Sequence, residues 1–355
     1  MRSWRYGCSK EIATPTKARC AGPRSLIGFA YCPSNLRVIE SLLISLTTDD
    51  ESTLRGKEDR IIRIGCFQLH DPVPELNEPY VLACLRPWID VNGVGSLVLN
   101  EVETRLTATE LGTLSRPGHF YDFTRYRPTI RLEDGIRDLS IPTTRIHYAK
   151  REGRNDIVLL RLLEPHAHSE FYVDSVLKLL KAVGAKKYIL LGSMHDMVPH
   201  TRPLLVSGYG MGKEARQDVK KAGALPLEHH GPSSIVNLIT KKAAEAGIDA
   251  ISFIVSLPQY VVLEEDYLGK VRLMEVLNML YDIPVDKDDF ERALEQRRLI
   301  GERVDETPAV KSLLPQLERV YDLRIQAVET EGAPRMTSEM EDIFWKIMGK
   351  DIGKA

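Results

Sequence analysis

The segment DIVLLRLLEPHAHSEFYVDSVLKLLKAVGAKKYILLG (residues 156–192) holds two apolar runs separated by an amphipathic stretch. Residues 156–163 and 186–192 have the length and composition of buried strands. Apolar residues recur between them at helical spacing, namely Val173, Val176, Leu177, Leu180 and Val183. Ser169 can cap the start of this helix, and Gly184 lies just past its end. The segment therefore predicts a β-α-β unit with parallel strands and a right-handed crossover.

The same alternation of strand and helix extends on both sides of this unit. Residues 80–85 and 249–256 are short apolar runs, and residues 235–247 have helical spacing that ends at a glycine. Strands that alternate with helices in this way form a parallel sheet with helices on both faces. We therefore predict an α/β fold, a three-layer α/β/α sandwich with a mostly parallel sheet, over residues 61–284.

The two ends of the chain read differently. Residues 285–355 predict helices only: Asp286 can cap a helix with Phe290, Ala293 and Leu294 on one stripe, and prolines at positions 284, 308, 315 and 334 separate the segments. Residues 1–60 have little periodicity and many polar residues, which predicts a poorly ordered N-terminal extension. A small appended module, or residues upstream of the true start, are the alternatives.

Composition excludes several classes of protein. The 355 residues are 43% hydrophobic and 28% charged, as in ordinary globular proteins. The formal net charge of −2 argues against a nucleic-acid partner, and no apolar run is long enough to span a membrane. Five cysteines without paired spacing are typical of reduced thiols in a cytoplasmic protein. We expect a cytoplasmic protein with neither membrane nor nucleic-acid partners.

Histidines and acids gather after the predicted strands. Ligands of open parallel sheets bind beyond the carboxyl ends of the strands, and six of the nine histidines lie between positions 166 and 230. The candidate ligand-binding residues at this edge are Glu164, His166, Ser193, His195, Asp196, His200, Arg202 and His229.

Catalytic and metal-binding motifs do not fit these residues well. The imidazoles and Asp196 could ligate a metal, but their spacing matches no recognised pattern, so we expect neither a metal nor a cofactor. Ser193 follows a strand as a nucleophile would, but LGSMH lacks the second glycine of the G-x-S-x-G elbow. The glycines before Lys213 do not match a phosphate-binding loop, because Glu214 follows the lysine.

The segment VPHTRP (residues 198–203) has two prolines that stiffen it. Arg202 could form a bidentate pair with Glu164 or Asp196 and hold this loop to the sheet. The structural interpretation is that Arg202 forms a buried salt bridge in a rigid turn. The functional alternative is that Arg202 binds an anion.

Several segments together resemble the PAC2 (proteasome assembly chaperone) family, most closely its archaeal and bacterial members. They are PWIDVNGVGSLVLNEV, FYDFTRYRP, LLEPHAHSEFYVDSVL, LGSMHDMVPHTRP, EHHGPSSIVNLI and SLPQYV, in that order between residues 87 and 261. The resemblance implies a fold similar to nucleoside phosphorylases, self-association, and a helical C-terminal part. Eukaryotic relatives escort proteasome subunits and dock through a C-terminal tail with a penultimate tyrosine. This chain ends in MGKDIGKA, which departs from that tail and argues against docking in that manner.

No set of catalytic residues comes with the resemblance, and its functional implication is binding. We therefore expect a homo-oligomeric, non-catalytic binding protein, an assembly chaperone for a complex such as the proteasome. The alternative is a phosphorylase-like or hydrolase-like enzyme, or a binder of a small nucleoside-containing or phosphate-containing ligand at the carboxyl edge of the strands. In that case His195 or His200 would act as acid or base.

Overall fold

The computed structural model describes residues 60–133, 136–227 and 231–331. Within these ranges, ten strands form one sheet in the order β1-β2-β4-β7-β8-β3-β9-β12-β10-β11. Its strands are β1 (Ile61–Ile64), β2 (Phe67–His70), β3 (Tyr80–Arg86), β4 (Thr109–Leu114), β7 (Arg145–Ala149), β8 (Ile157–Leu163), β9 (Lys187–Asp196), β10 (Val206–Met211), β11 (Leu225–Pro226) and β12 (Asp249–Pro258).

The centre of the sheet is parallel, as the alternation of strands and helices predicts. Strands β8, β3, β9 and β12 lie side by side and run in the same direction. The strands of the predicted β-α-β unit, β8 and β9, are parallel, but β3 lies between them and pairs with both. Their side chains are almost all buried because helices cover both faces here.

The prediction of a mostly parallel sheet was wrong for the sheet as a whole. Strands β1, β2, β4, β7 and β8 pair antiparallel to one another, and β10 is antiparallel to β12. Parallel neighbours need a long crossover, whereas β1 is joined to β2 by two residues and β7 to β8 by seven. The sheet is therefore mixed, with a parallel centre between antiparallel flanks.

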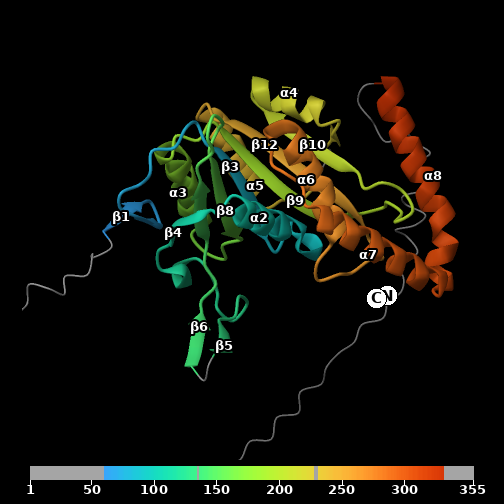
Figure 1. Cartoon of the computed structure of the whole chain (residues 1–355), viewed down its shortest axis with the longest axis horizontal. Helices are drawn as coiled ribbons and strands as arrows, with labels where there is room; N and C mark the ends of the chain where they lie inside the picture. The colour runs from blue at the N-terminus through green and yellow to red at the C-terminus, as the bar shows by residue number, and fades with distance from the viewer. Residues whose placement is uncertain (1–59, 134–135, 228–230, 332–355) are drawn as a thin grey trace, which may run out of the picture. The chain divides into compact units, whose positions relative to one another are not determined.

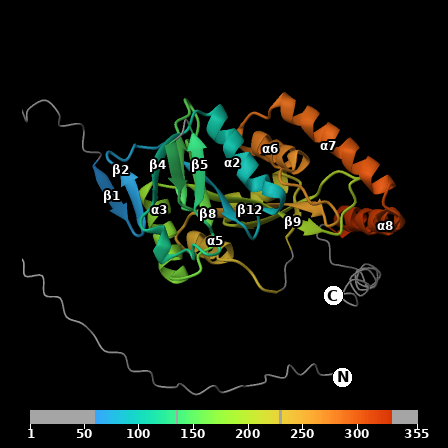
Figure 2. The ribbon, with the colours of Figure 1, turned by 90° about the horizontal axis from the view of Figure 1, so that it is seen from below.

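Helices form a layer on each face of this sheet (Figure 2). On one face α3 (Ser169–Ala182) and α5 (Val236–Glu245) enclose a core that includes Tyr172, Val176 and Ile239. On the other face α2 (Val94–Arg105), α4 (Lys213–Lys221) and α6 (Tyr267–Tyr281) enclose a second core. Two single turns, η1 (Val91–Gly93) and η2 (Pro117–His119), lie in the connections.

The last part of the described chain is helical, as predicted, with α7 (Lys287–Asp305) and α8 (Pro308–Glu331) (Figure 1). Asp286 caps α7 by accepting a hydrogen bond from the Asp288 N–H group. Pro315 lies inside α8 instead of separating two segments, which corrects one predicted break. None of the helices in the described ranges has the length and apolar character needed to cross a bilayer.

A separate two-stranded sheet consists of β5 (Thr129–Glu133) and β6 (Ile136–Ser140). This hairpin extends away from the body of the large sheet (Figure 1). The predicted N-terminal extension lies outside the described residues but for residue 60, and so do residues 332–355. The predicted division of the chain at residues 61 and 284 stays a prediction.

Candidate functional site

The carboxyl ends of the four parallel strands define one edge of the sheet, where the sequence predicts a site. Strands β8, β3, β9 and β12 end there at residues 163, 86, 196 and 258. The predicted residues do not converge at one point of this edge. They fall into a group at the end of β9, a group in the loop after β9, and a group after β8.

Ser193 has a structural role near the end of β9. It is fully buried, and its Oγ donates a hydrogen bond to the Val91 carbonyl at 2.6 Å. Its N–H group donates to the Ile89 carbonyl at 2.9 Å. A Cβ on the preceding Gly192 would lie 2.6 Å from that same carbonyl oxygen, so only glycine permits this approach. The LGS sequence therefore fixes the chain after β3 against β9.

Asp196, the last residue of β9, is paired with a helix far along the chain. Its Oδ2 accepts hydrogen bonds from Arg324 Nη1 of α8 at 2.7 Å and from Ser256 Oγ at 2.8 Å. Burial alone would raise the pKa of Asp196, but the Arg324 charge and these hydrogen bonds outweigh it and hold the pKa below its ordinary value. The carboxylate is thus a fixed anion that joins β9 to α8.

His200 lies in the loop after β9, and its side chain is buried. Both its backbone N–H group and its Nδ1 atom lie within 2.8 Å of the Tyr260 hydroxyl oxygen. Burial lowers the pKa of His200, and the nearby positive charge of Arg297 lowers it further. The side chain is therefore a neutral structural group near pH 7. His195, at the end of β9, is exposed.

The predicted partners of Arg202 were wrong. Arg202 forms ion pairs with Glu318 and Asp322 of α8, each at 3.2 Å, and its side chain is 35% exposed. Glu164 and Asp196 are engaged elsewhere, Asp196 by Arg324. Arg202 therefore joins its loop to α8 through partly exposed ion pairs, and it does not form a buried salt bridge.

A small core completes this contact between the loop and α8. Tyr321 of α8 packs with Val198, Leu205 and Leu225, and all four side chains are buried. The Tyr321 hydroxyl also donates a hydrogen bond to the Pro203 carbonyl at 3.0 Å. The VPHTRP loop is therefore a seat for α8. We call this part of the edge, made by residues 196–205 and α8, the helix seat.

Glu164 and His166 lie apart from the helix seat, after β8. Glu164 Oε1 accepts a hydrogen bond from the Ile235 N–H group just before α5, and burial raises the pKa of this carboxyl. His166 is exposed, and its Nδ1 accepts from the Asp122 N–H group. His229 lies outside the described residues. The ligand-binding role of the predicted set stays a prediction.

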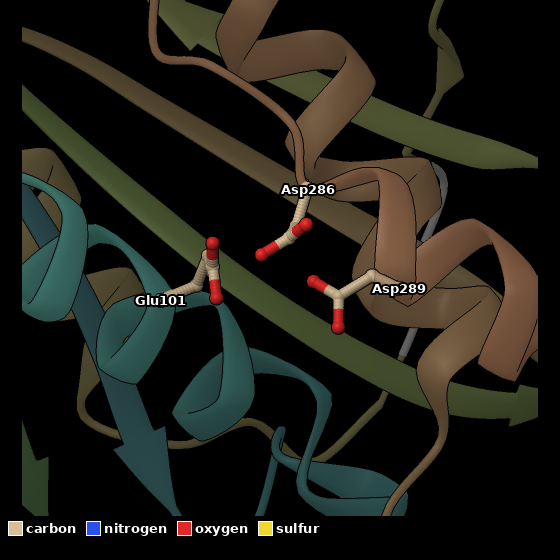
Figure 3. Close-up of side chains that lie close together, drawn as sticks. All are labelled: Glu101, Asp286 and Asp289. Carbon is tan, nitrogen blue, oxygen red and sulfur yellow. The ribbon is translucent and has the colours of Figure 1, made fainter.

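One cluster of acids in the described residues is compact enough to suggest a metal. Glu101, Asp286 and Asp289 point toward one another between α2 and the start of α7 (Figure 3). Lys270 Nζ lies 3.2 Å from Glu101 and 2.5 Å from Asp289, and Arg105 pairs with Glu101 and Asp286. Two cations thus neutralise most of the charge, and the arrangement is an ion-pair network that joins α2, α6 and α7.

A cavity of about 780 Å³ opens at the same edge, beside the ends of β3 and β8. Its walls come from α2, β7, β8, the segment before β5, and the β5–β6 hairpin. Five arginines line it: Arg86, Arg127, Arg131, Arg145 and Arg161. We call this cavity the arginine pocket.

The hairpin presents a different face to each side. Because side chains alternate along a strand, Thr129 and Arg131 of β5 share one face with Asp138 and Ser140 of β6, and all four line the arginine pocket. Ile130, Leu132 and Leu139 share the opposite face and are 62%, 69% and 56% exposed. The hairpin is therefore mostly polar toward the pocket and mostly apolar toward the outside, where Arg137 lies opposite Leu132 in the register.

The prediction from sequence missed both the pocket and the hairpin. Its arginines are scattered over 76 positions of the chain, and charged residues normally indicate a solvated face. The hairpin had a usable signal, because TIRLE alternates before an Asp-Gly pair, one of the preferred sequences for a two-residue hairpin turn.

Comparison with known proteins adds the family. The sequence model of the PAC2 family matches residues 84–306. The chain belongs to the PAC2 family. This match covers β8, β9, β12, the end of β3, the arginine pocket and residues 196–205 of the helix seat, and it ends before α8. The resemblance drawn from the sequence motifs is confirmed.

Solved structures show the same fold. A PAC2 family protein from Streptomyces avermitilis aligns with a TM-score of 0.60 and 24% identity, over 67% of this chain and 99% of that one. A Mycobacterium tuberculosis proteasome-assembly chaperone homologue gives 0.59 and 24%, over 66% and 98%. An archaeal proteasome activator from Pyrococcus furiosus gives 0.51 and 16%, over 64% and 94%. No curated protein matches the sequence.

Proposed function

We propose that this chain is a non-catalytic, self-associating binding protein of the cytoplasm that assists the assembly of a protein complex such as the proteasome. Family membership supports a chaperone-like role, because a similar structure is named a proteasome-assembly chaperone homologue. The described cysteines, Cys66 and Cys84, are free thiols, as expected for a cytoplasmic protein.

The apolar outer face of the β5–β6 hairpin is the observation that carries this proposal. Three aliphatic side chains more than half exposed on a two-stranded sheet have no core of their own to enter. Contiguous exposed apolar surface of this kind marks protein–protein contacts. The hairpin gives the chain a surface for another protein, and a second copy of the chain is the simplest partner.

The catalytic alternative needs acid, base and anion-binding residues around one cavity. His200 instead binds Tyr260 inside the helix seat, and Arg202 is occupied by two carboxylates. Arg202 therefore holds α8, and His200 joins its loop to Tyr260 after β12, which favours structural roles over catalysis for both residues.

Light scattering on the purified full chain tests self-association. We expect an oligomer that dissociates when Ile130→Ser and Leu139→Ser are combined, because these residues are cross-strand partners on the apolar face. The control combines Leu238→Ser and Leu294→Ser, two leucines that are 50% and 65% exposed on α5 and α7. A monomeric wild type, or equal dissociation of the control, would overturn the proposal.

A further inference from the structure

Four of the five pocket arginines have no acidic partner among the residues that the structure describes. Arg86, Arg127, Arg131 and Arg145 are exposed and line the same cavity. Other arginines of the described chain, such as Arg202 and Arg324, bind carboxylates at 3.2 Å or less. Single exposed arginines such as Arg216 also have no acidic partner among the described residues, but in the pocket four of them line one cavity, so positive charge is concentrated there.

The acids of the pocket do not offset this charge. Glu103 is already paired with Arg161, and its other oxygen lies 3.5 Å from His147 Nε2. Arg161 also donates to Asn100 Oδ1 at 3.1 Å, so it is held in place at the back of the cavity. Asp138 is the remaining carboxylate, opposite Arg131 in the hairpin register.

Arginine suits the recognition of phosphate groups. Its planar guanidinium donates two parallel hydrogen bonds to phosphate oxygens and keeps its charge at any physiological pH. Hydroxyl and amide groups of Asn100, Thr129 and Ser140 line the same walls and can supply further donors. A ligand that gathers several negative charges in a small volume would best match four arginines that line one cavity.

We propose that the arginine pocket binds a small molecule through an oligophosphate group, two or more linked phosphates. The cavity volume lies within the range of about 300–1,000 Å³ that is usual for small-molecule sites. The pocket also lies at the carboxyl ends of parallel strands, where α/β sheets bind ligands. This site is separate from the protein-binding function proposed above.

The pocket offers little for an attached aromatic base. Tyr126 is the aromatic ring of its walls, and that ring already packs against His166 and Tyr121, with centroids 4.6 and 5.6 Å away. Its hydroxyl donates to the Glu164 carbonyl. The phosphate chain therefore provides the affinity, and the rest of the ligand stays outside or makes few contacts.

Isothermal titration calorimetry of the full chain with inorganic triphosphate, pyrophosphate and citrate tests this proposal. The variant combines Arg86→Gln and Arg145→Gln, which remove charge from two sides of the pocket. The matched control is Arg216→Gln, an exposed arginine of α4 whose side chain does not line the pocket. Arg127→Gln serves as an independent pocket variant, and circular dichroism checks that each protein is folded.

We expect saturable binding of triphosphate at one site per chain, weaker binding of pyrophosphate, and little binding of citrate. The double variant should bind triphosphate at least about 10-fold more weakly, and Arg127→Gln about 10-fold, because each removes charge-assisted hydrogen bonds. Arg216→Gln should bind as wild type does. Equal loss in Arg216→Gln, equal binding of citrate, or no binding of triphosphate at about 0.15 M salt would each overturn the proposal. Self-association measured by light scattering is a separate readout, so the two proposals can fail independently.

Discussion

The two parts of the carboxyl edge of the parallel strands differ in whether their charged side chains have partners. At the helix seat, beside β9 and β12, Asp196 and Arg202 each have an opposite charge on α8. At the arginine pocket, beside β3 and β8, four arginines have no carboxylate partner among the described residues. A charged side chain that is paired with a neighbouring helix stabilises the fold, whereas an unpaired one is available to bind a ligand. The predicted candidates Asp196 and Arg202 belong to the first kind. None of the four arginines of the second kind was among the predicted candidates, although Arg127 lies in the family segment FYDFTRYRP.

Tyr321→Ala should produce the largest loss of stability at the helix seat. It empties the centre of the small core with Val198, Leu205 and Leu225. We expect the free energy of unfolding to fall by about 3 kcal/mol, measured by denaturant titration. Tyr321→Phe is the control that removes only the hydrogen bond to Pro203, and it should cost about 1 kcal/mol. Equal losses would mean that the hydroxyl and not the packing holds α8.

Asp196→Asn should cause the second-largest loss of stability, because it leaves Arg324 without its charged partner. We expect a loss of about 2 kcal/mol, between the values of exposed and buried ion pairs. The folded pKa of Asp196 is lowered, so its stabilising effect is complete above the unfolded value near 3.9 and is lost as the pH falls through the folded pKa. The difference between wild type and variant should therefore be constant from about pH 5 to 8 and shrink below about pH 4. A difference that grows in acid would contradict this assignment.

Arg145→Gln in the arginine pocket should behave in the opposite way. No carboxylate of the described chain loses a partner, and repulsion with the other arginines decreases. We expect the free energy of unfolding to change by less than about 0.5 kcal/mol, in the direction of greater stability. A clear loss of stability would mean that this arginine has a structural role and would break the contrast with the helix seat.

The smallest effect concerns the protonation of His147 at the back of the pocket. Burial lowers the pKa of His147; the charges of Arg161 and Arg145 lower it further, while Glu103 and Glu110 raise it. Arg145→Gln should raise this pKa, and bound triphosphate should raise it in the wild type. Histidine resonances followed by NMR across pH 4–9 measure both shifts, and Arg216→Gln provides the control. A lower pKa in either case would show that the pocket charge does not act on His147.

Much of the fold could be predicted from the sequence, because its centre is governed by local patterns. The helical spacing of Val173, Val176 and Leu180 places them on the buried face of α3, and the apolar run after it becomes β9. The flanks could not be predicted in this way. Strand β1 is exposed along most of its length, so it has no buried periodicity, and its partner is set by the two-residue turn to β2.

The candidate site was harder to predict from the sequence, because the residues that meet there lie far apart in the chain. Arg202 was expected to bind an acid of a neighbouring loop, but its partners lie 116 and 120 positions away on α8. The residues that open into the pocket come from five separate segments. Motifs record local geometry, whereas both halves of this edge are made by contacts between distant parts of the chain.

The contact between Asp196 and Arg324 also sets a delay during synthesis of the protein. The two residues are 128 positions apart, and ribosomes add about 5–20 residues per second. Roughly 6–25 s therefore pass between the synthesis of residues 196–205 and the synthesis of α8, which covers them. During this interval Val198 and Leu205 have no Tyr321 to cover them. A nascent chain at this stage exposes these apolar side chains, which makes them available for aggregation or for capture by cellular folding factors.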